Sequence, residues 1–212
     1  MPKDKNNISM SVIKRLPRYY RFLCELKKQG VVRTSSKELS QRMGFTASQI
    51  RQDLNCFGGF GQQGYGYNVE QLSAEIGSIL GVGSDFKTII IGCGNLGKAI
   101  ASHMTFEDRG FELVGIFDKR ASEMTDIKIK GISINDISEL EMYCKEIEPV
   151  VAVLCIPTES TREIVDRLVN LGVTNFWNFT HFDINSIYPD AIVENVHLND
   201  SLMTLSYQIL NK

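Results

Sequence analysis

The sequence predicts an α/β protein with an N-terminal winged helix-turn-helix domain, a Rossmann-type doubly wound parallel sheet and a C-terminal helix. Three observations lead to this expectation. Residues 1–80 carry a helix-turn-helix pattern followed by a glycine-rich segment, residues 86–196 alternate apolar strands with helices, and one strand runs directly into Gly92-x-Gly94-x-x-Gly97. We expect a DNA-binding domain over 1–80, a dinucleotide-binding domain over 81–196 and a dimerisation helix over 197–212.

Charge divides the chain in the same place, although the net charge of its 212 residues is only −2. Residues 1–80 hold twelve Lys and Arg against six Asp and Glu, a net charge of +6. Residues 81–212 hold eleven against nineteen, a net charge of −8. A basic head on an acidic body is typical of a DNA-binding domain joined to one that does not contact DNA. Chance clustering of charge on solvated faces is the alternative.

The cysteines, histidines and apolar runs exclude several classes. The five cysteines include no Cys-x-x-Cys pair and the three histidines lack metal-ligand spacing, which argues against a disulfide framework and a structural metal. The N-terminal residues are too polar for a signal peptide, and no apolar run approaches the ~18 residues of a membrane span. We therefore expect a cytoplasmic protein with no membrane partner.

Helix signals define the first domain. Pro17 suits the first turn of a helix that ends near Gly30. Ser35 precedes a second helix, to about Arg42, as its N-cap, with Glu38 at capping-box distance. After the turn at 43–45, Thr46 caps a third helix, which we expect to bury Ile50, Leu54 and Phe57.

The third helix is the expected recognition helix, since the second helix of a helix-turn-helix enters the major groove. Arg can bond guanine, and Gln or Asn can bond adenine. Glycines and aromatics over 57–67 predict a β-hairpin wing. A helical interaction module with a flexible loop is the alternative. The candidate DNA contacts are Ser35, Ser36, Thr46, Ser48, Gln49, Arg51, Gln52, Asn55, Gln63, Gly64 and Tyr65.

The second domain should form a parallel sheet covered on both faces, because its apolar strands alternate with helices. Strands are expected at 89–91, 113–117, 127–132, 150–156 and 175–179, and helices at 95–104, 136–147 and 158–171.

The glycine pattern has a mechanical interpretation. Gly92 makes the tight turn, Gly94 lets a pyrophosphate approach the backbone, and Gly97 lets helix pack on strand. Asp118 ends the second strand 21 residues after Gly97, where its carboxylate should bind ribose hydroxyls and repel a 2′-phosphate. This favours NAD(H), although Lys119 and the neighbouring Arg120 leave NADP(H) open. The candidate cofactor contacts are Ile91, Gly92, Cys93, Gly94, Asn95, Leu96, Gly97, Asp118 and Lys119.

An enzyme would need more than this site. Only 16 residues follow position 196, which leaves no room for a substrate domain, and His103, His181 and His197 fit no catalytic pattern. The cofactor is therefore expected to be a regulatory ligand, with no catalytic residue. Two alternatives remain: an NAD-dependent oxidoreductase whose N-terminal helices dimerise, and a regulator that binds another adenine-containing ligand such as coenzyme A.

The last helix, over 198–210, places Leu198, Leu202, Leu205 and Ile209 on one face, with Met203 and Leu210 beside it. So apolar a helix needs a partner. It either packs on its own domain or crosses to a second protomer.

The chain resembles the Rex family of redox-sensing transcriptional repressors over essentially its full length. The segments that carry the resemblance are residues 15–21, 49–54, 57–58, 64–69, 92–97, 178–179 and 193–196. The resemblance implies a homodimer with a swapped C-terminal helix. It also implies that NAD⁺ is compatible with binding to palindromic, AT-rich operator DNA, that NADH releases it, and that fermentation and NADH-reoxidation genes are controlled. Asn178 and Phe179 join the candidate cofactor contacts.

The sequence departs from better-known members at several positions. His197 stands where relatives commonly have Asp, and His103 aligns with a Tyr found in some of them. In those relatives the Asp and Tyr form a network with an Arg at the position of Arg21. Arg21, His103 and His197 are therefore the candidate switch residues, and we expect their response to NADH to depend on pH. Gln63 and its neighbour Gln62 replace basic wing residues of some relatives.

Overall fold

A computed structural model of the chain describes residues 8–58, 61–62 and 65–211. The chain forms two compact units, Met1–Val82 and Gly83–Lys212. Among the described residues, no helix is both long enough and apolar enough to cross a membrane.

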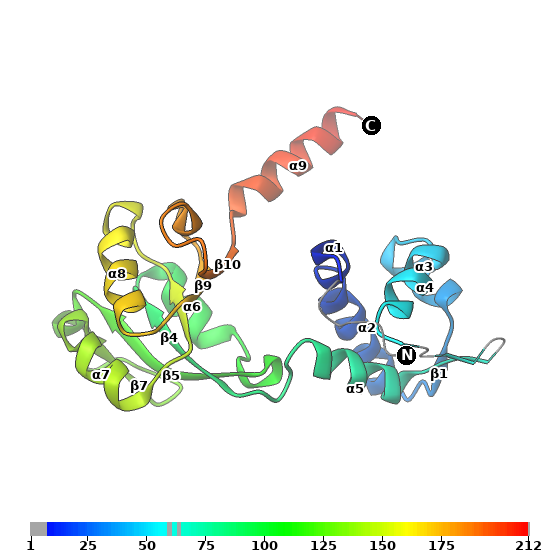
Figure 1. Ribbon diagram of the computed structural model, residues 1–212, viewed down its shortest axis with the longest axis horizontal. Helices are drawn as coiled ribbons and strands as arrows, with labels where there is room; N and C mark the ends of the chain where they lie inside the picture. Colours follow the sequence, from blue (N-terminus) through cyan, green and yellow to red (C-terminus); the bar gives the residue numbers. More distant parts are fainter. Residues whose placement is uncertain (1–7, 59–60, 63–64, 212) are drawn as a thin grey trace. The chain divides into compact units, whose positions relative to one another are not determined.

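The first unit is a winged helix, as predicted (Figure 1). Its helices are α1 (Met10–Ile13), α2 (Leu16–Lys28), α3 (Ser36–Met43), α4 (Ala47–Asn55) and α5 (Val69–Ile79). Its strands β1 (Arg33–Thr34), β2 (Gly61–Gln62) and β3 (Gly66–Asn68) form an antiparallel sheet in the order β1-β3-β2. The predicted contacts Gln63 and Gly64 lie outside the described residues.

Local signals place α2, α3 and α4 where the sequence predicted helices, whereas α1 and α5 were not predicted. Ser35 and Glu38 form both hydrogen bonds of a capping box at the start of α3, and Thr46 accepts a hydrogen bond from the Gln49 amide at the start of α4. Gly44 ends α3 in the left-handed conformation, at a φ of 69°. Phe57 does not lie on the third helix, because α4 ends two residues earlier. It still packs against the domain core.

The second unit is a seven-stranded sheet in the order β10-β9-β8-β4-β5-β7-β6. Its strands are β4 (Phe86–Ile91), β5 (Phe111–Asp118), β6 (Lys128–Ile129), β7 (Ile132–Asp136), β8 (Val151–Leu154), β9 (Asn175–Asn178) and β10 (Ile192–Asn195). All neighbours pair in parallel except β6 with β7. The predicted strand over 127–132 was wrong, because Lys130 (φ 51°) and Gly131 (φ 83°) make a turn that divides it into two antiparallel strands.

Helices cover both faces of this sheet (Figure 1). Alternate residues of β4 divide between two cores: Ile90 packs with α6 (Asn95–His103), and Ile89 and Ile91 pack with α7 (Leu140–Ile147) and α8 (Thr158–Asn170). The short 3₁₀ turn η4 (Ile137–Glu139) leads into α7. The sheet is thus doubly wound, as predicted, and its connections reverse direction between β4 and β8.

The C-terminal helix α9 (Leu198–Leu210) has the predicted bounds and no buried residue. Of its predicted apolar face, Leu202 is 65% exposed, Leu205 51% and Ile209 63%. The structure therefore leaves this apolar face without cover among the described residues.

Candidate functional site

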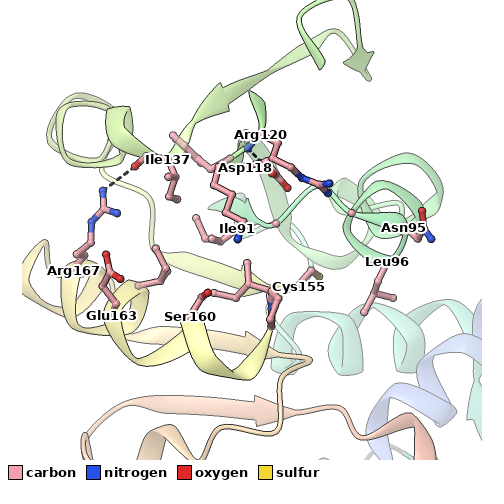
Figure 2. A pocket seen from close by; sticks show the side chains of 17 residues that line it. Ile91, Asn95, Leu96, Asp118, Arg120, Ile137, Cys155, Ser160, Glu163 and Arg167 are labelled. Atoms are coloured by element: carbon pink, nitrogen blue, oxygen red, sulfur yellow. Dashed lines mark hydrogen bonds between the residues drawn. The ribbon is translucent and has the colours of Figure 1, made fainter. Parts of the chain in front are cut away.

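A cavity of about 760 Å³ opens at the carboxyl ends of β4, β5 and β8. This is the point where the strand order reverses, which is where open α/β sheets bind ligands. Its volume lies within the ~300–1,000 Å³ usual for small-molecule sites. Figure 2 shows the side chains that surround it. The lining includes the predicted Ile91, Gly92, Gly94, Asn95, Leu96, Asp118 and Lys119.

The turn from β4 into α6 requires its glycines for different reasons. Gly92 has a φ of 97°, and a Cβ there would lie 2.4 Å from the carbonyl oxygen of Cys155. A Cβ on Gly97 would lie 1.9 Å from the carbonyl oxygen of Gly92, so only glycine permits this contact between helix and strand. Around Gly94 no atom of the described part of the chain lies within 4 Å of the Cβ position. The backbone at Gly94 is therefore open to the cavity.

The start of α6 faces this opening without a side-chain cap. Gly94 is the N-cap residue and supplies no side-chain hydrogen bond. The first amides of a helix need partners, and the helix dipole favours an anion there. A phosphate placed above Gly94 would satisfy both requirements.

Asp118 holds the glycine turn against the end of β5. Its side chain is only 7% exposed. One carboxylate oxygen accepts a hydrogen bond from the Cys93 amide at 2.7 Å, and the other accepts one from the Arg120 amide at 2.9 Å. Each oxygen keeps a second acceptor position, so the carboxylate can also bind ribose hydroxyls. Asp118 therefore has a structural role that the sequence did not indicate, beside the predicted one.

The cavity thiol is chemically quiet. Burial raises the pKa of Cys155 to about 12, and burial also raises the pKa of Cys93. Both groups are therefore neutral at physiological pH, whereas a nucleophilic cysteine acts as its thiolate. Among the described residues, no group of three or more His, Cys, Asp or Glu could hold a metal ion.

Four predicted cofactor contacts are not among the residues that line the cavity: Cys93, Gly97, Asn178 and Phe179. Asn178 is fully buried, and its amide nitrogen donates to the Phe182 carbonyl and the Asn195 side chain. Its side-chain oxygen accepts from Thr180. Asn178 thus holds together the chain after β9, and the neighbouring Phe179 packs edge-on against Trp177.

The far wall of the cavity was not predicted from the sequence. Ile156, Pro157 and the α8 residues Ser160, Glu163, Ile164 and Arg167 line it, together with Ile137 of η4. One signal could have found the first of them. Carboxyl ends of parallel strands meet at one edge, so the residues after β8 had to lie beside the glycine turn.

The predicted recognition helix presents a polar face. Ser48, Arg51, Gln52 and Asn55 are exposed and Gln49 is half-buried, whereas Ile50 and Leu54 are buried. Arg51 donates a hydrogen bond to Ser36 at the start of α3. In the wing, Arg33 donates to the carbonyl oxygen of Tyr65, whose side chain is 69% exposed. Ser35 and Thr46 use their side-chain oxygens as caps.

Comparisons with known proteins also divide the chain into an N-terminal DNA-binding part and a second, ligand-binding part. Residues 7–55 match the family model described as "Putative DNA-binding protein N-terminus", and residues 83–182 match the CoA binding domain. A redox-sensing transcriptional repressor Rex of Clostridium perfringens (strain SM101) is 51% identical over 205 residues, which cover 97% of this chain and 96% of the relative. The Rex of Clostridium botulinum (strain Eklund 17B) is 50% identical over 207 residues, 97% of this chain and 98% of the relative. The chain belongs to the Rex family of redox-sensing transcriptional repressors.

Solved structures of the Rex-family repressor RSP share the same fold. RSP in complex with β-NAD⁺ and operator DNA is 50% identical, with a TM-score of 0.87 over 96% of this chain and 93% of RSP. RSP in complex with β-NADH is 48% identical, with a TM-score of 0.86 over 95% of this chain and 94% of RSP.

The three candidate switch residues of this Rex-family chain belong to different elements. Arg21 is exposed on α2 in the first unit. His103 is exposed in the last turn of α6, and His197 precedes α9 as its N-cap residue. The His197 ring stacks on His181, with ring centroids 5.3 Å apart and planes inclined by 10°. Its buried Nδ1 has no hydrogen-bond partner among the residues that the structure describes. The structure thus adds His181 to the surroundings of His197.

Proposed function

We propose that this Rex-family repressor binds NAD(H) in the cavity of its second unit and operator DNA through its first unit, and that NADH releases the DNA. The cavity supports the ligand assignment, because an open helix N-terminus at Gly94 and the carboxylate of Asp118 suit a pyrophosphate and an adenine ribose. RSP, which is 48–50% identical, has been solved with NAD⁺ and with NADH. We place this repressor in the cytoplasm, where NAD(H) and DNA meet.

Coenzyme A is the second candidate, because residues 83–182 match a family model named for it. Its adenosine carries a 3′-phosphate. The negative charge of the buried Asp118 carboxylate would lie close to that 3′-phosphate. It would lie equally close to the 2′-phosphate of NADP(H). Like charges disfavour both ligands, so we propose NAD(H).

The recognition surface is proposed to be Ser48, Gln49, Arg51, Gln52 and Asn55 on α4, with Ser35, Ser36 and Thr46 at the helix starts and the wing beside them. Arg51→Ala should cost about 1–3 kcal/mol of operator binding if Arg51 contacts a base. Arg162→Ala, an exposed arginine of α8, removes the same charge in the other unit and is the control.

A homodimer is the proposed assembly, held together by α9 of each protomer. An apolar groove of about 650 Å³ in the second unit is lined by Phe86, Phe106, Phe111, Val153, Trp177 and Ile192, among others. We propose that the exposed apolar face of α9 from the second protomer covers this groove.

One titration tests the whole proposal. Fluorescent palindromic, AT-rich DNA is bound to the protein, and NADH, NAD⁺, NADPH and coenzyme A are added in turn while anisotropy is recorded. NADH should release DNA at the lowest concentration, and by reciprocity DNA should weaken NADH binding by the same factor. Release by coenzyme A alone would contradict the assignment.

The candidate switch has its own test. We propose that Arg21, His103 and His197 change contacts between cofactor states, and that protonation of either histidine disfavours its approach to Arg21. NADH-driven release should then weaken between about pH 8 and pH 6, where imidazoles change charge. A His103→Gln, His197→Gln double variant should lose this dependence, and a His181→Gln variant reports on the stacked ring. Equal pH profiles in wild type and double variant would refute the histidine hypothesis.

A further inference from the structure

The cavity has a second end, beyond Asp118, that the glycine turn does not explain. There α8 contributes Ser160, Glu163, Ile164 and Arg167, whose spacing places them on one side of the helix. Ile137 faces them from η4. Figure 2 shows Glu163 and Arg167 side by side on α8, with Ile137 across the cavity from them. This end is therefore a slot with apolar walls and two charged groups.

The positively charged group in this slot, Arg167, already has hydrogen-bond partners within the protein. Arg167 donates to both carboxylate oxygens of Glu141, at 2.6 and 2.8 Å, and to the carbonyl oxygen of Ile137 at 2.8 Å. These bonds join α8 to α7 and to η4, so they fix the distance between the two walls of the slot. Bidentate arginine–carboxylate pairs are geometrically specific. Arg167 is thus a positioning residue for the slot.

The negative charge in the slot is the group left for a ligand. Glu163 is exposed, and no hydrogen bond to its carboxylate is found within 8–58, 61–62 and 65–211. Lys119 and Arg120 also line the cavity, and the Arg120 amide donates to Asp118, which accepts from the Cys93 amide of the glycine turn. The cavity therefore changes from an anion-binding end, through apolar walls, to a hydrogen-bond-accepting end. A nucleotide has the matching order: phosphate, then an apolar ring, then an exocyclic group.

We propose that Glu163 accepts a hydrogen bond from the exocyclic amino group of adenine and thereby selects adenine dinucleotides over their 6-oxo counterparts. The inference rests on the proposed binding of NAD(H) in this cavity. The 6-amino group of adenine donates hydrogen bonds, whereas the 6-oxo group of hypoxanthine accepts them. A carboxylate is acceptor-only when ionised, so it attracts the first group and repels the second. Glu163 is then a specificity-determining residue.

The test compares NADH with reduced nicotinamide hypoxanthine dinucleotide, whose base has a 6-oxo group and an N1–H in place of the 6-amino group and the N1 acceptor of adenine. Binding of each is measured by isothermal titration calorimetry on the full chain. Wild type should bind NADH about three- to tenfold more tightly, the usual effect of one hydrogen bond. Glu163→Gln should bring the ratio close to one, because an amide accepts from the amine and donates to the 6-oxo group. Glu163→Ala should also reduce it.

Glu159→Gln is the matched control, since Glu159 is exposed in the first turn of the same helix and does not line the cavity. It should keep the wild-type ratio. Equal affinity of wild type for the two dinucleotides, or an unchanged ratio in Glu163→Gln, would overturn the role of Glu163 while leaving NADH binding in place. Failure of wild type to bind NADH at all would overturn the proposed function itself.

Discussion

Arg15 on the approach to α2 holds Asp53 of the recognition helix α4 by two hydrogen bonds. Its Nε and Nη2 each donate to one carboxylate oxygen at 2.7 Å. Tyr19 of α2 donates a third, also at 2.7 Å, and Asp53 is only 2% exposed. Because α4 is held on its buried side at Asp53, its opposite side faces outward. The pair therefore positions the polar face of α4, including Arg51 and Gln52, for contact with DNA.

We expect Arg15→Met to destabilise the first unit by about 3 kcal/mol, because removing one partner leaves a buried carboxylate with an uncompensated charge. Burial raises the pKa of Asp53, but hydrogen bonds from Arg15 and Tyr19 outweigh it, so the net pKa lies below its ordinary value. Between the folded and unfolded pKa values the unfolded state holds more protons. The stabilisation is therefore present above the unfolded value of ~3.9 and is lost as pH falls through the folded value.

Urea unfolding at pH 7, 5, 4 and 3, followed by far-ultraviolet circular dichroism, measures this effect. The difference in unfolding free energy between wild type and Arg15→Met should be largest at pH 7 and shrink towards pH 3. Fluorescence of Trp177, the single tryptophan, follows the second unit and should be the same in both proteins. A difference that stays constant across this pH range would contradict the assigned role of the pair.

The same added methyl group should affect stability at Gly97 and NADH binding at Gly94. A Cβ at Gly97 would lie 1.9 Å from the Gly92 carbonyl oxygen, so Gly97→Ala must separate α6 from β4 and lower the melting temperature of the second unit. At Gly94 the φ is −71°, and no described residue has an atom within 4 Å of the Cβ position. Gly94→Ala should keep the melting temperature and lose NADH affinity, because its methyl group occupies the place of the pyrophosphate.

Thermal unfolding and NADH titration of both variants separate these two effects. Normal NADH affinity in Gly94→Ala would show that no phosphate lies over this residue. A Gly97→Ala protein as stable as wild type would show that the turn can rearrange.

Local signals made much of this molecule predictable from its sequence. The capping box of Ser35 and Glu38, the Thr46 cap and the glycine spacing each involve residues within one or two turns, so the sequence contains the whole interaction. The same kind of signal was overlooked at α5, which Asn68 caps and whose buried Val69, Leu72 and Ile76 follow helical spacing. It was also overlooked at the short helix α1, which Ser9 caps.

Other elements depend on contacts that sequence spacing does not contain. β1 has two residues and exists because it pairs with β3, 33 to 35 positions away. β10 is an edge strand whose four residues are at most half-buried, so it lacks the apolar pattern of a central strand. In the cavity, Arg167 joins Glu141 and Ile137 across 26 and 30 positions. Such long-range bonds follow from the fold and could not be predicted before it.

Asp118 should determine both cofactor choice and the order of the glycine turn. Asp118→Ala removes the acceptor of the Cys93 and Arg120 amides, and an unpaired buried donor costs about 1–3 kcal/mol. We therefore expect a lower melting temperature of the second unit, weaker NADH binding and a smaller preference for NADH over NADPH. Asp118→Asn keeps one carbonyl acceptor and removes the charge. It should retain more stability while its preference for NADH falls.

Calorimetric titration of NADH and NADPH into wild type and both variants checks these expectations. Equal affinity of wild type for the two dinucleotides would contradict the assignment of Asp118. A preference that survives in Asp118→Asn would mean that shape, rather than charge, excludes the 2′-phosphate.

The exposed apolar face of α9 should hold two protomers together. Leu202 and Leu205 are 65% and 51% exposed, and covering one such side chain contributes about 1.5–3 kcal/mol. A Leu202→Asp, Leu205→Asp double variant places two charges on that face and should shift the protein from dimer to monomer. Thr204→Asp is the control, because helical spacing places Thr204 well away from that face. Multi-angle light scattering across a dilution series measures the change.

Truncation after Val196 should have the same effect as the double variant, since it removes the helix altogether. A dimer as tight as wild type in both proteins would assign the interface to another surface. Loss of the dimer in Thr204→Asp as well would mean that charge anywhere on α9 is disruptive, and the apolar face would lose its special role.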